Sequence, residues 1–114
     1  MPTRLFVYGT LRRGHKAHHL LNGQKFLGEA RTQPLYRLLD RGPYPCLVLD
    51  PPRGCAVHGE IWQVSDDLLP VLDRYEGPEF HREPVALEGD PSPTQAYFFH
   101  GDTAGYPDCG DRWC

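Results

Sequence analysis

The feature that most constrains the fold is the frequency of chain-breaking residues, since 12 glycines and 12 prolines interrupt the 114 residues. This density favours short strands and tight turns over long helices. Between the breaks lie seven segments with apolar runs or with alternating apolar and polar residues, and both patterns are typical of strands. The predicted strands are 4–8, 25–31, 35–40, 45–50, 55–64, 79–87 and 94–100. The first of them, RLFVY, is an apolar run that we expect to be buried on both faces.

Two segments are predicted to be helical. The clearer one, 67–77, begins with Asp67 as the expected N-cap, carries Pro70 in its first turn and stops at a Gly-Pro pair. The shorter one, 15–22, ends at an Asn-Gly pair. Together these elements predict an α+β fold, a small and strongly curved mixed β-barrel of about six or seven short strands with one or two packed helices. The length suits a single domain that covers residues 1–114.

Charge and hydropathy argue against several classes of protein. The net charge of −3 argues against general nucleic-acid binding, which normally needs an excess of basic residues. No apolar run approaches the roughly 18 to 20 residues of a membrane-spanning helix, and the N-terminal segment lacks the pattern of a signal peptide. We therefore expect a cytoplasmic protein that binds neither nucleic acid nor membranes. The sequence does not predict its oligomeric state.

The four cysteines do not form a recognisable metal or redox motif. No pair has the C-x-x-C spacing among Cys46, Cys55, Cys109 and Cys114. In a cytoplasmic protein we expect ordinary thiols, and a disulfide between Cys109 and Cys114 stays open as an alternative under oxidising conditions.

The stretch VYGTLRRGHK, residues 7–16, has the glycine spacing of a phosphate-binding loop but not its other residues. In such a loop a lysine directly follows the second glycine and a hydroxyl residue comes next, whereas this chain has His15 and Lys16 there. A second interpretation is a metal site, because His15, His18 and His19 are spaced to share a helix face. Histidines in a segment that also contains lysine are more often a polar surface.

Gly9 and Thr10 follow the first predicted strand and allow a third interpretation of this stretch. The glycine permits close approach of the backbone, and the threonine supplies a hydroxyl group. Consecutive backbone N–H groups in such a turn can bind an anion without any nucleotide. The alternative is a plain turn that ends the strand.

Glu76 is the candidate for acid–base chemistry. At about 100° per residue it falls inside the apolar arc of the predicted helix, whereas Asp73 and Arg74 fall outside it. The arc consists of Leu68, Leu69, Val71, Leu72 and Tyr75. Burial and the negative end of the helix dipole would both raise the pKa of this carboxyl group, which suits a proton carrier near neutral pH. The alternative is that Glu76 bends to solvent or pairs with Arg74, Arg82 or Lys16.

Four segments form a recognisable pattern: FVYGTLRRGHKAHHLL at 6–21, VHGEIWQV at 57–64, LDRYEGPEFHREPV at 72–85 and, more vaguely, CGDRWC at 109–114. Together they resemble the γ-glutamylcyclotransferase-like superfamily, in its AIG2-like and γ-glutamylamine cyclotransferase branch. The resemblance extends over essentially the whole chain, with the segments in the expected order. It implies a small mixed β-barrel with helices packed outside.

The resemblance also implies a reaction and its residues. The free α-amine of a γ-glutamyl group attacks its own γ-carbonyl group, which releases 5-oxoproline and an amine or amino acid. Tyr8, Gly9, Thr10 and Leu11 fall on the substrate-binding loop, and Glu76 falls on the general acid/base. The reaction requires a small-molecule γ-glutamyl substrate and needs no metal or cofactor. The alternative is a non-catalytic domain that holds a small anionic metabolite in the same cavity.

Other polar residues are secondary candidates. Glu60 lies at a potentially buried position of a predicted strand, where we expect a structural hydrogen-bonding role. Arg12 or Arg13 would suit a two-pronged contact with a substrate carboxylate, although exposed arginines usually only improve solubility. Arg82 and Tyr44 are weaker candidates for lining the cavity.

Overall fold

The computed structural model describes residues 2–113 and contains a strand in each of the seven predicted segments. The strands are β1 (Thr3–Val7), β2 (Lys25–Arg31), β3 (Tyr36–Asp40), β4 (Pro45–Leu49), β5 (His58–Val64), β6 (Phe80–Pro84) and β7 (Gln95–Phe99). The only α-helix within this range is α1 (Leu69–Glu76). Short 3-10 turns occur at His18–Leu21, Pro51–Arg53 and Asp66–Leu68. The predicted α+β class is confirmed.

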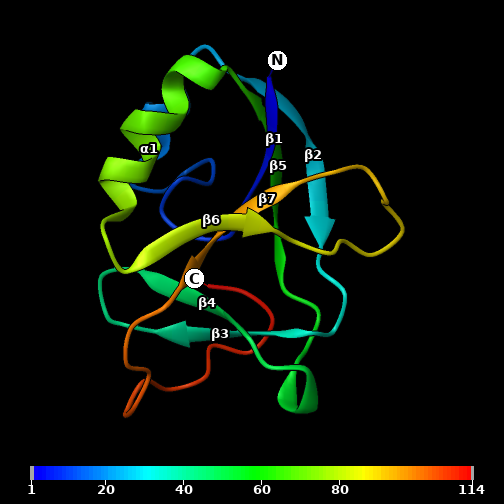
Figure 1. The fold of residues 1–114 in the computed structure, drawn as a ribbon, viewed down its shortest axis with the longest axis vertical. Coiled ribbons are helices and arrows are strands. Elements are labelled where there is room, and N and C mark those ends of the chain that lie inside the picture. The colour runs from blue at the N-terminus through cyan, green and yellow to red at the C-terminus, as the bar shows by residue number, and fades with distance from the viewer. Residues whose placement is uncertain (1, 114) are drawn as a thin grey trace.

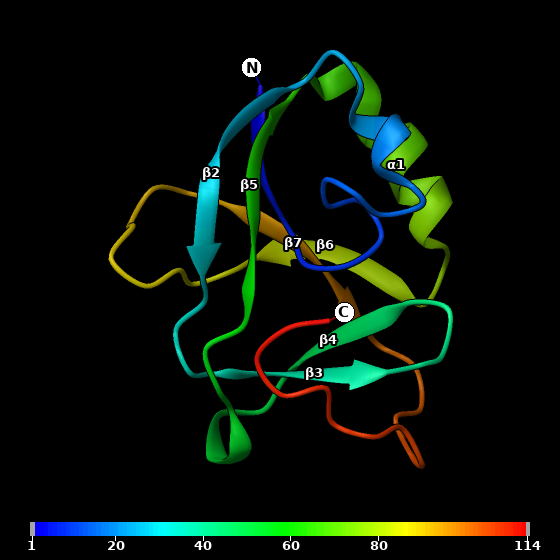
Figure 2. The same ribbon diagram turned by 180° about the vertical axis from the view of Figure 1, so that it is seen from behind.

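All seven strands belong to one mixed sheet, with the order β2-β5-β1-β7-β4-β3 and with β6 added to β7. Strand β7 pairs in parallel with β1 and β4, whereas the other pairs are antiparallel. Figure 1, and Figure 2 from behind, show β3 and β4 running across the lower part of the molecule, while β1, β2 and β5 run along its length. Within residues 2–113 the edge strands β2 and β3 do not pair with each other, so the sheet is curved like a barrel without closing into one.

Strand β1 lies between two hydrophobic cores. Leu5 and Val7 belong to one core, which also contains Leu72 of α1. Phe6 and Tyr8 belong to the other core. Because successive side chains of a strand point to opposite faces, both faces of β1 are buried, as its apolar run predicts.

The start of α1 differs from its prediction. A 3-10 turn, Asp66–Leu68, follows Ser65, and α1 then begins at Leu69 without a side-chain cap. The prediction that Asp67 is the N-cap is wrong, because Asp67 lies inside the 3-10 turn and an N-cap needs a non-helical backbone. Pro70 does lie in the first turn of the helix, as predicted.

The end of α1 is confirmed, whereas its buried face is narrower than predicted. Gly77 has a φ of 94° and donates its N–H to the carbonyl oxygen of Asp73, so it ends the helix as expected. Leu72 is fully buried, but Val71 and Tyr75 are 41% and 40% exposed. Only part of the predicted apolar arc is therefore covered by the sheet.

The predicted helix at 15–22 is only a four-residue 3-10 turn, His18–Leu21, which ends at Asn22 as expected. The N–H of Ala17 donates to the carbonyl oxygen of Thr10 at 3.0 Å and folds the segment back on the preceding loop. Too few residues then remain before Asn22 for a stable α-helix.

Two further expectations concern membranes and cysteines. No helix in the described part of the chain is long and apolar enough to cross a membrane. Cys46 and Cys55 are thiols. Cys114 lies outside the described residues, so its pairing with Cys109 stays a prediction.

Candidate functional site

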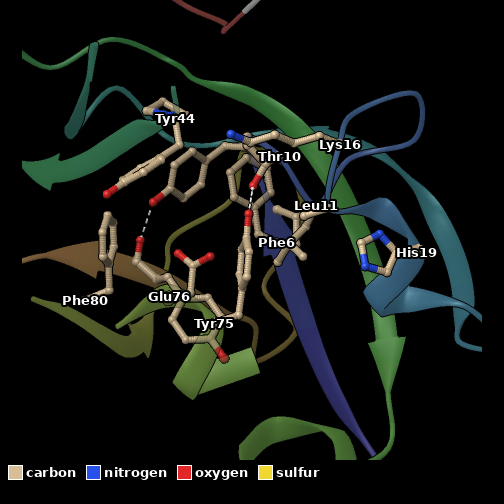
Figure 3. A pocket seen from close by; sticks show the side chains of 15 residues that line it. Phe6, Thr10, Leu11, Lys16, His19, Tyr44, Tyr75, Glu76 and Phe80 are labelled. Atoms are coloured by element: carbon tan, nitrogen blue, oxygen red, sulfur yellow. Dashed lines mark hydrogen bonds between the residues drawn. The ribbon is translucent and has the colours of Figure 1, made fainter. Parts of the chain in front are cut away.

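A cavity of about 370 Å³ opens between the loop that follows β1 and the C-terminal end of α1. Its volume suits a small molecule, and its walls are mainly apolar and aromatic (Figure 3). The lining residues are 6–11, Lys16, Ala17, His19, Tyr44, Pro45, Tyr75, Glu76, Phe80 and Tyr97. All five predicted site residues are among them: Tyr8, Gly9, Thr10, Leu11 and Glu76.

The loop after β1 is held in place by its carbonyl groups. The carbonyl oxygens of Gly9, Thr10 and Leu11 each accept a hydrogen bond from a residue further along the loop, at 3.0 to 3.1 Å. The N–H groups of the same three residues donate to no acceptor within residues 2–113. Three consecutive backbone donors therefore lie in the cavity-lining loop, an arrangement typical of an anion-binding turn.

Gly9 is required by packing rather than by an unusual backbone angle. A Cβ atom at this position would lie 2.7 Å from Cγ of Pro45, the first residue of β4. Its φ is not positive, so the backbone itself would tolerate other residues. The sequence predicted that another group approaches the backbone closely at Gly9. In the structure that group is the ring of Pro45.

Tyr8 and Thr10 tie this loop to two different walls of the cavity. The Tyr8 hydroxyl donates to the carbonyl oxygen of Tyr97 at 2.6 Å, and burial raises the pKa of Tyr8 well above its usual value, so the hydroxyl stays protonated. The hydroxyl oxygens of Thr10 and Tyr75 lie 2.7 Å apart and share a hydrogen bond (Figure 3). This bond joins the loop to the residue that precedes Glu76.

Glu76, the last residue of α1, directs its carboxylate into the cavity (Figure 3). Burial raises the pKa of Glu76 to about 7. The predicted alternative, an ion pair with Arg74, Arg82 or Lys16, is absent from residues 2–113. The carboxyl group can therefore exchange a proton with a ligand near neutral pH.

Glu60 does not line the cavity and has the structural role expected of it. Its Oε1 accepts hydrogen bonds from the Arg13 backbone N–H and the Trp62 indole N–H, both at 3.1 Å. Its Oε2 lies 3.1 Å from the Arg13 Nε. Burial alone would raise the pKa of Glu60, but these hydrogen bonds hold it below its usual value. The carboxyl group of Glu60 therefore stays ionised and anchors the loop, and it does not act as a proton carrier.

Arg12 and Arg13 were candidates for contacting a ligand, and Arg82 was a candidate for lining the cavity. Neither suggestion is supported, because none of the three lines the cavity. Arg12 donates to two backbone carbonyl oxygens. Arg13 pairs with Glu60. Arg82 pairs with Asp73 of α1 at 3.0 Å. These arginine side chains therefore stabilise the protein around the cavity and do not contact a ligand inside it.

Several lining residues escaped prediction, and Lys16 is the most informative of them. Its ammonium group pairs with no carboxylate in the described chain, and Figure 3 shows it reaching over the cavity from the side opposite Glu76. Phe80 and Tyr97 were also missed, whereas Tyr44 lines the cavity as expected. Only the folding of the loop back on itself brings Lys16 here, and no local sequence signal indicates that.

The three histidines of this segment do not form a metal site. The ring of His15 lies tilted against Trp113, His18 packs against Trp62, and His19 lines the cavity. They were expected to share a helix face, but the 3-10 turn begins only at His18. The same short turn rules out the long helix that a phosphate-binding loop requires.

Comparison with known proteins gives a consistent result. The family model described as "Gamma-glutamyl cyclotransferase, AIG2-like" matches residues 5–114. A Vibrio cholerae protein named putative gamma-glutamylcyclotransferase is 42% identical over 76 residues, which cover 67% of this chain and 64% of that protein. The gamma-glutamylaminecyclotransferase of Bos taurus is 37% identical over 114 residues, which cover 90% of this chain and 67% of that protein. The crystal structure of an AIG2-like protein from Mus musculus has a TM-score of 0.85 at 24% identity, over 99% of this chain and 88% of that one.

The likeness to the mouse structure shows the fold alone, since the identity is only 24%. The chain spans 64% and 53% of the length of two of the curated relatives it matches. The activity and substrate of the whole protein therefore do not follow from these likenesses without an argument from the site.

Proposed function

Because the chain belongs to the AIG2-like γ-glutamyl cyclotransferase family, we propose that it releases 5-oxoproline from γ-glutamyl compounds by intramolecular cyclisation. The α-amine attacks the γ-carbonyl carbon, so a C–N bond closes the five-membered lactam. The C–N bond to the leaving group breaks, and the proton lost by the attacking amine ends on the leaving nitrogen. Since both reacting groups belong to one molecule, holding it in the attack geometry accounts for much of the acceleration.

The observation that carries this proposal is the carboxyl group of Glu76, which has no ion-pair partner within residues 2–113 and lies in a cavity of substrate size. With a pKa of about 7, both protonation states of Glu76 are populated near neutral pH. In the proposed mechanism Glu76 accepts the proton of the attacking amine and then donates a proton to the leaving nitrogen. No metal or cofactor takes part in these steps.

The loop after β1 supports the proposal with fixed donors. As the amine adds, negative charge develops on the γ-carbonyl oxygen, and prearranged backbone N–H groups stabilise such an oxyanion. In the proposed mechanism the N–H groups of Gly9, Thr10 and Leu11 have this role. Tyr44 and Phe80 line the cavity with aromatic rings. In the proposed mechanism these rings limit the access of water, which would otherwise compete with the amine.

Lys16 is the proposed partner of the substrate's α-carboxylate. Replacing Lys16 with Met should raise KM about tenfold and change kcat little, because a charged hydrogen bond contributes about 1.5–3 kcal/mol and an exposed one less. Steady-state kinetics of 5-oxoproline release measures this split. The matched control is Lys25→Met, an exposed lysine of β2 that does not line the cavity. An unchanged KM in the Lys16 variant would show that the carboxylate binds elsewhere.

A second candidate function is binding of a small anionic metabolite without turnover. The backbone donors and Lys16, which pairs with no carboxylate within residues 2–113, favour it, because such groups can bind an anion whether or not a reaction follows. Release of 5-oxoproline and amine in equal amounts from a γ-glutamyl amine tests the proposed reaction. Saturable binding without any product, with an affinity that Glu76→Gln leaves intact, would favour the binding function instead.

A further inference from the structure

The register of β6 and β7 brings three metal-ligating side chains together, of which His81 and His100 are exposed and Glu83 is partly exposed. The two strands are antiparallel, with His81 opposite Phe98. Glu83 lies two residues after His81, and His100 lies two residues after Phe98, so all three share one face of the strand pair. The His100 N–H donates to the carbonyl oxygen of Glu79 at 2.7 Å, which extends the pairing to this residue. The backbone positions of the three residues are therefore fixed relative to one another.

The side chains of these residues already converge. The rings of His81 and His100 stack with centroids 4.4 Å apart and planes 24° apart. His100 Nε2 lies 3.1 Å from Oε1 of Glu83. One ligating atom from each residue lies within 4.8 Å of the other two. Nitrogen and oxygen ligands of a tetrahedral zinc ion lie roughly 3.3 Å apart, so these side chains would have to rotate closer together to coordinate an ion.

We propose that His81, Glu83 and His100 bind a divalent transition-metal ion of the kind that zinc represents. Two imidazoles and one carboxylate are ligand types that such ions prefer, and three protein ligands leave a coordination position for water. None of the three residues lines the cavity that contains Glu76. The ion would join β6 (Figure 1) to the residue after β7 and hold this strand pair together.

Calorimetric titration of the full chain with Zn²⁺, after removal of metal with a chelator, tests this site. We expect one ion to bind per chain and the midpoint of thermal unfolding to rise when zinc is present. The double variant His81→Ala/His100→Ala should lose both effects, and Glu83→Gln should weaken binding. His58→Ala is the matched control, because His58 also lies near a carboxylate, Asp111 at 3.5 Å, but has no third ligand among residues 2–113. It should bind zinc like the wild type.

Two further measurements keep the test independent of folding and of the cysteines. The spectrum of bound Co²⁺ should lack a thiolate charge-transfer band, and NMR should show zinc-dependent shifts of the His81 and His100 ring signals. Glu76→Gln should bind zinc like the wild type, so failure of the proposed reaction would leave this site intact. Wild-type protein that binds no zinc, a thiolate band, or a folded double variant with unchanged affinity would each overturn the proposal.

Discussion

Replacement of Glu76 by Gln is expected to lower kcat/KM for 5-oxoproline release by about 100- to 10,000-fold, the usual contribution of a general acid or base. The amide has nearly the same size but cannot carry the proton from the attacking amine to the leaving nitrogen. In the wild type, kcat/KM should rise with pH through about 7, because the free protein must hold Glu76 ionised to accept a proton. Initial rates across pH measure both effects.

Glu79→Gln is the matched control for this substitution. Glu79 lies only three residues away, but it pairs with Arg41 on the surface and does not line the cavity. Its variant should keep nearly full activity. Turnover that survives Glu76→Gln, or that is lost instead in Glu79→Gln or Glu60→Gln, would assign the proton transfer to another carboxyl group.

Glu76→Gln should also change how the stability of the fold depends on pH. The pKa of Glu76 is raised from 4.5 to about 7 in the folded chain, so between these values the folded state binds more protons than the unfolded state. Wild-type stability therefore falls as pH rises through this window, by about 3 kcal/mol from this group. Gln cannot ionise. As pH rises through this window, the free energy of unfolding of the variant should therefore increase by that amount relative to the wild type.

Urea unfolding of both proteins at several pH values between about 4 and 8 measures this difference. All other ionisable groups are common to the two proteins, so their contributions largely cancel when the curves are subtracted. Parallel stability curves would mean that Glu76 ionises in the folded chain as it does in the unfolded one.

Local features could be predicted from the sequence because they depend on neighbouring residues. The burial of RLFVY on both faces follows from its apolar run, and the stop of α1 follows from Gly77. The position of Glu76 on the covered side of the helix follows from helical periodicity. The N-cap at Asp67 was wrong because a 3-10 turn precedes α1, and no local pattern distinguishes that turn from the first turn of an α-helix.

Features built from distant segments could not be predicted in this way. Lys16 reaches the cavity only because Ala17 bonds back to Thr10. Tyr97 reaches it through the parallel pairing of β7 with β1 and β4. The cluster that includes His81 and His100 depends on strand register. Periodicity indicates which face of an element is covered, whereas it does not indicate which residues meet there.

The most direct test of the proposed activity is product analysis with the wild-type protein near neutral pH. A γ-glutamyl amine is incubated with the protein, and 5-oxoproline, glutamate and the free amine are separated and quantified over time. Cyclisation predicts 5-oxoproline and amine in equal amounts, with no glutamate beyond the level of a reaction without protein. Release of glutamate instead of 5-oxoproline, or saturable binding with no product from any γ-glutamyl amine or amino acid tested, would contradict it.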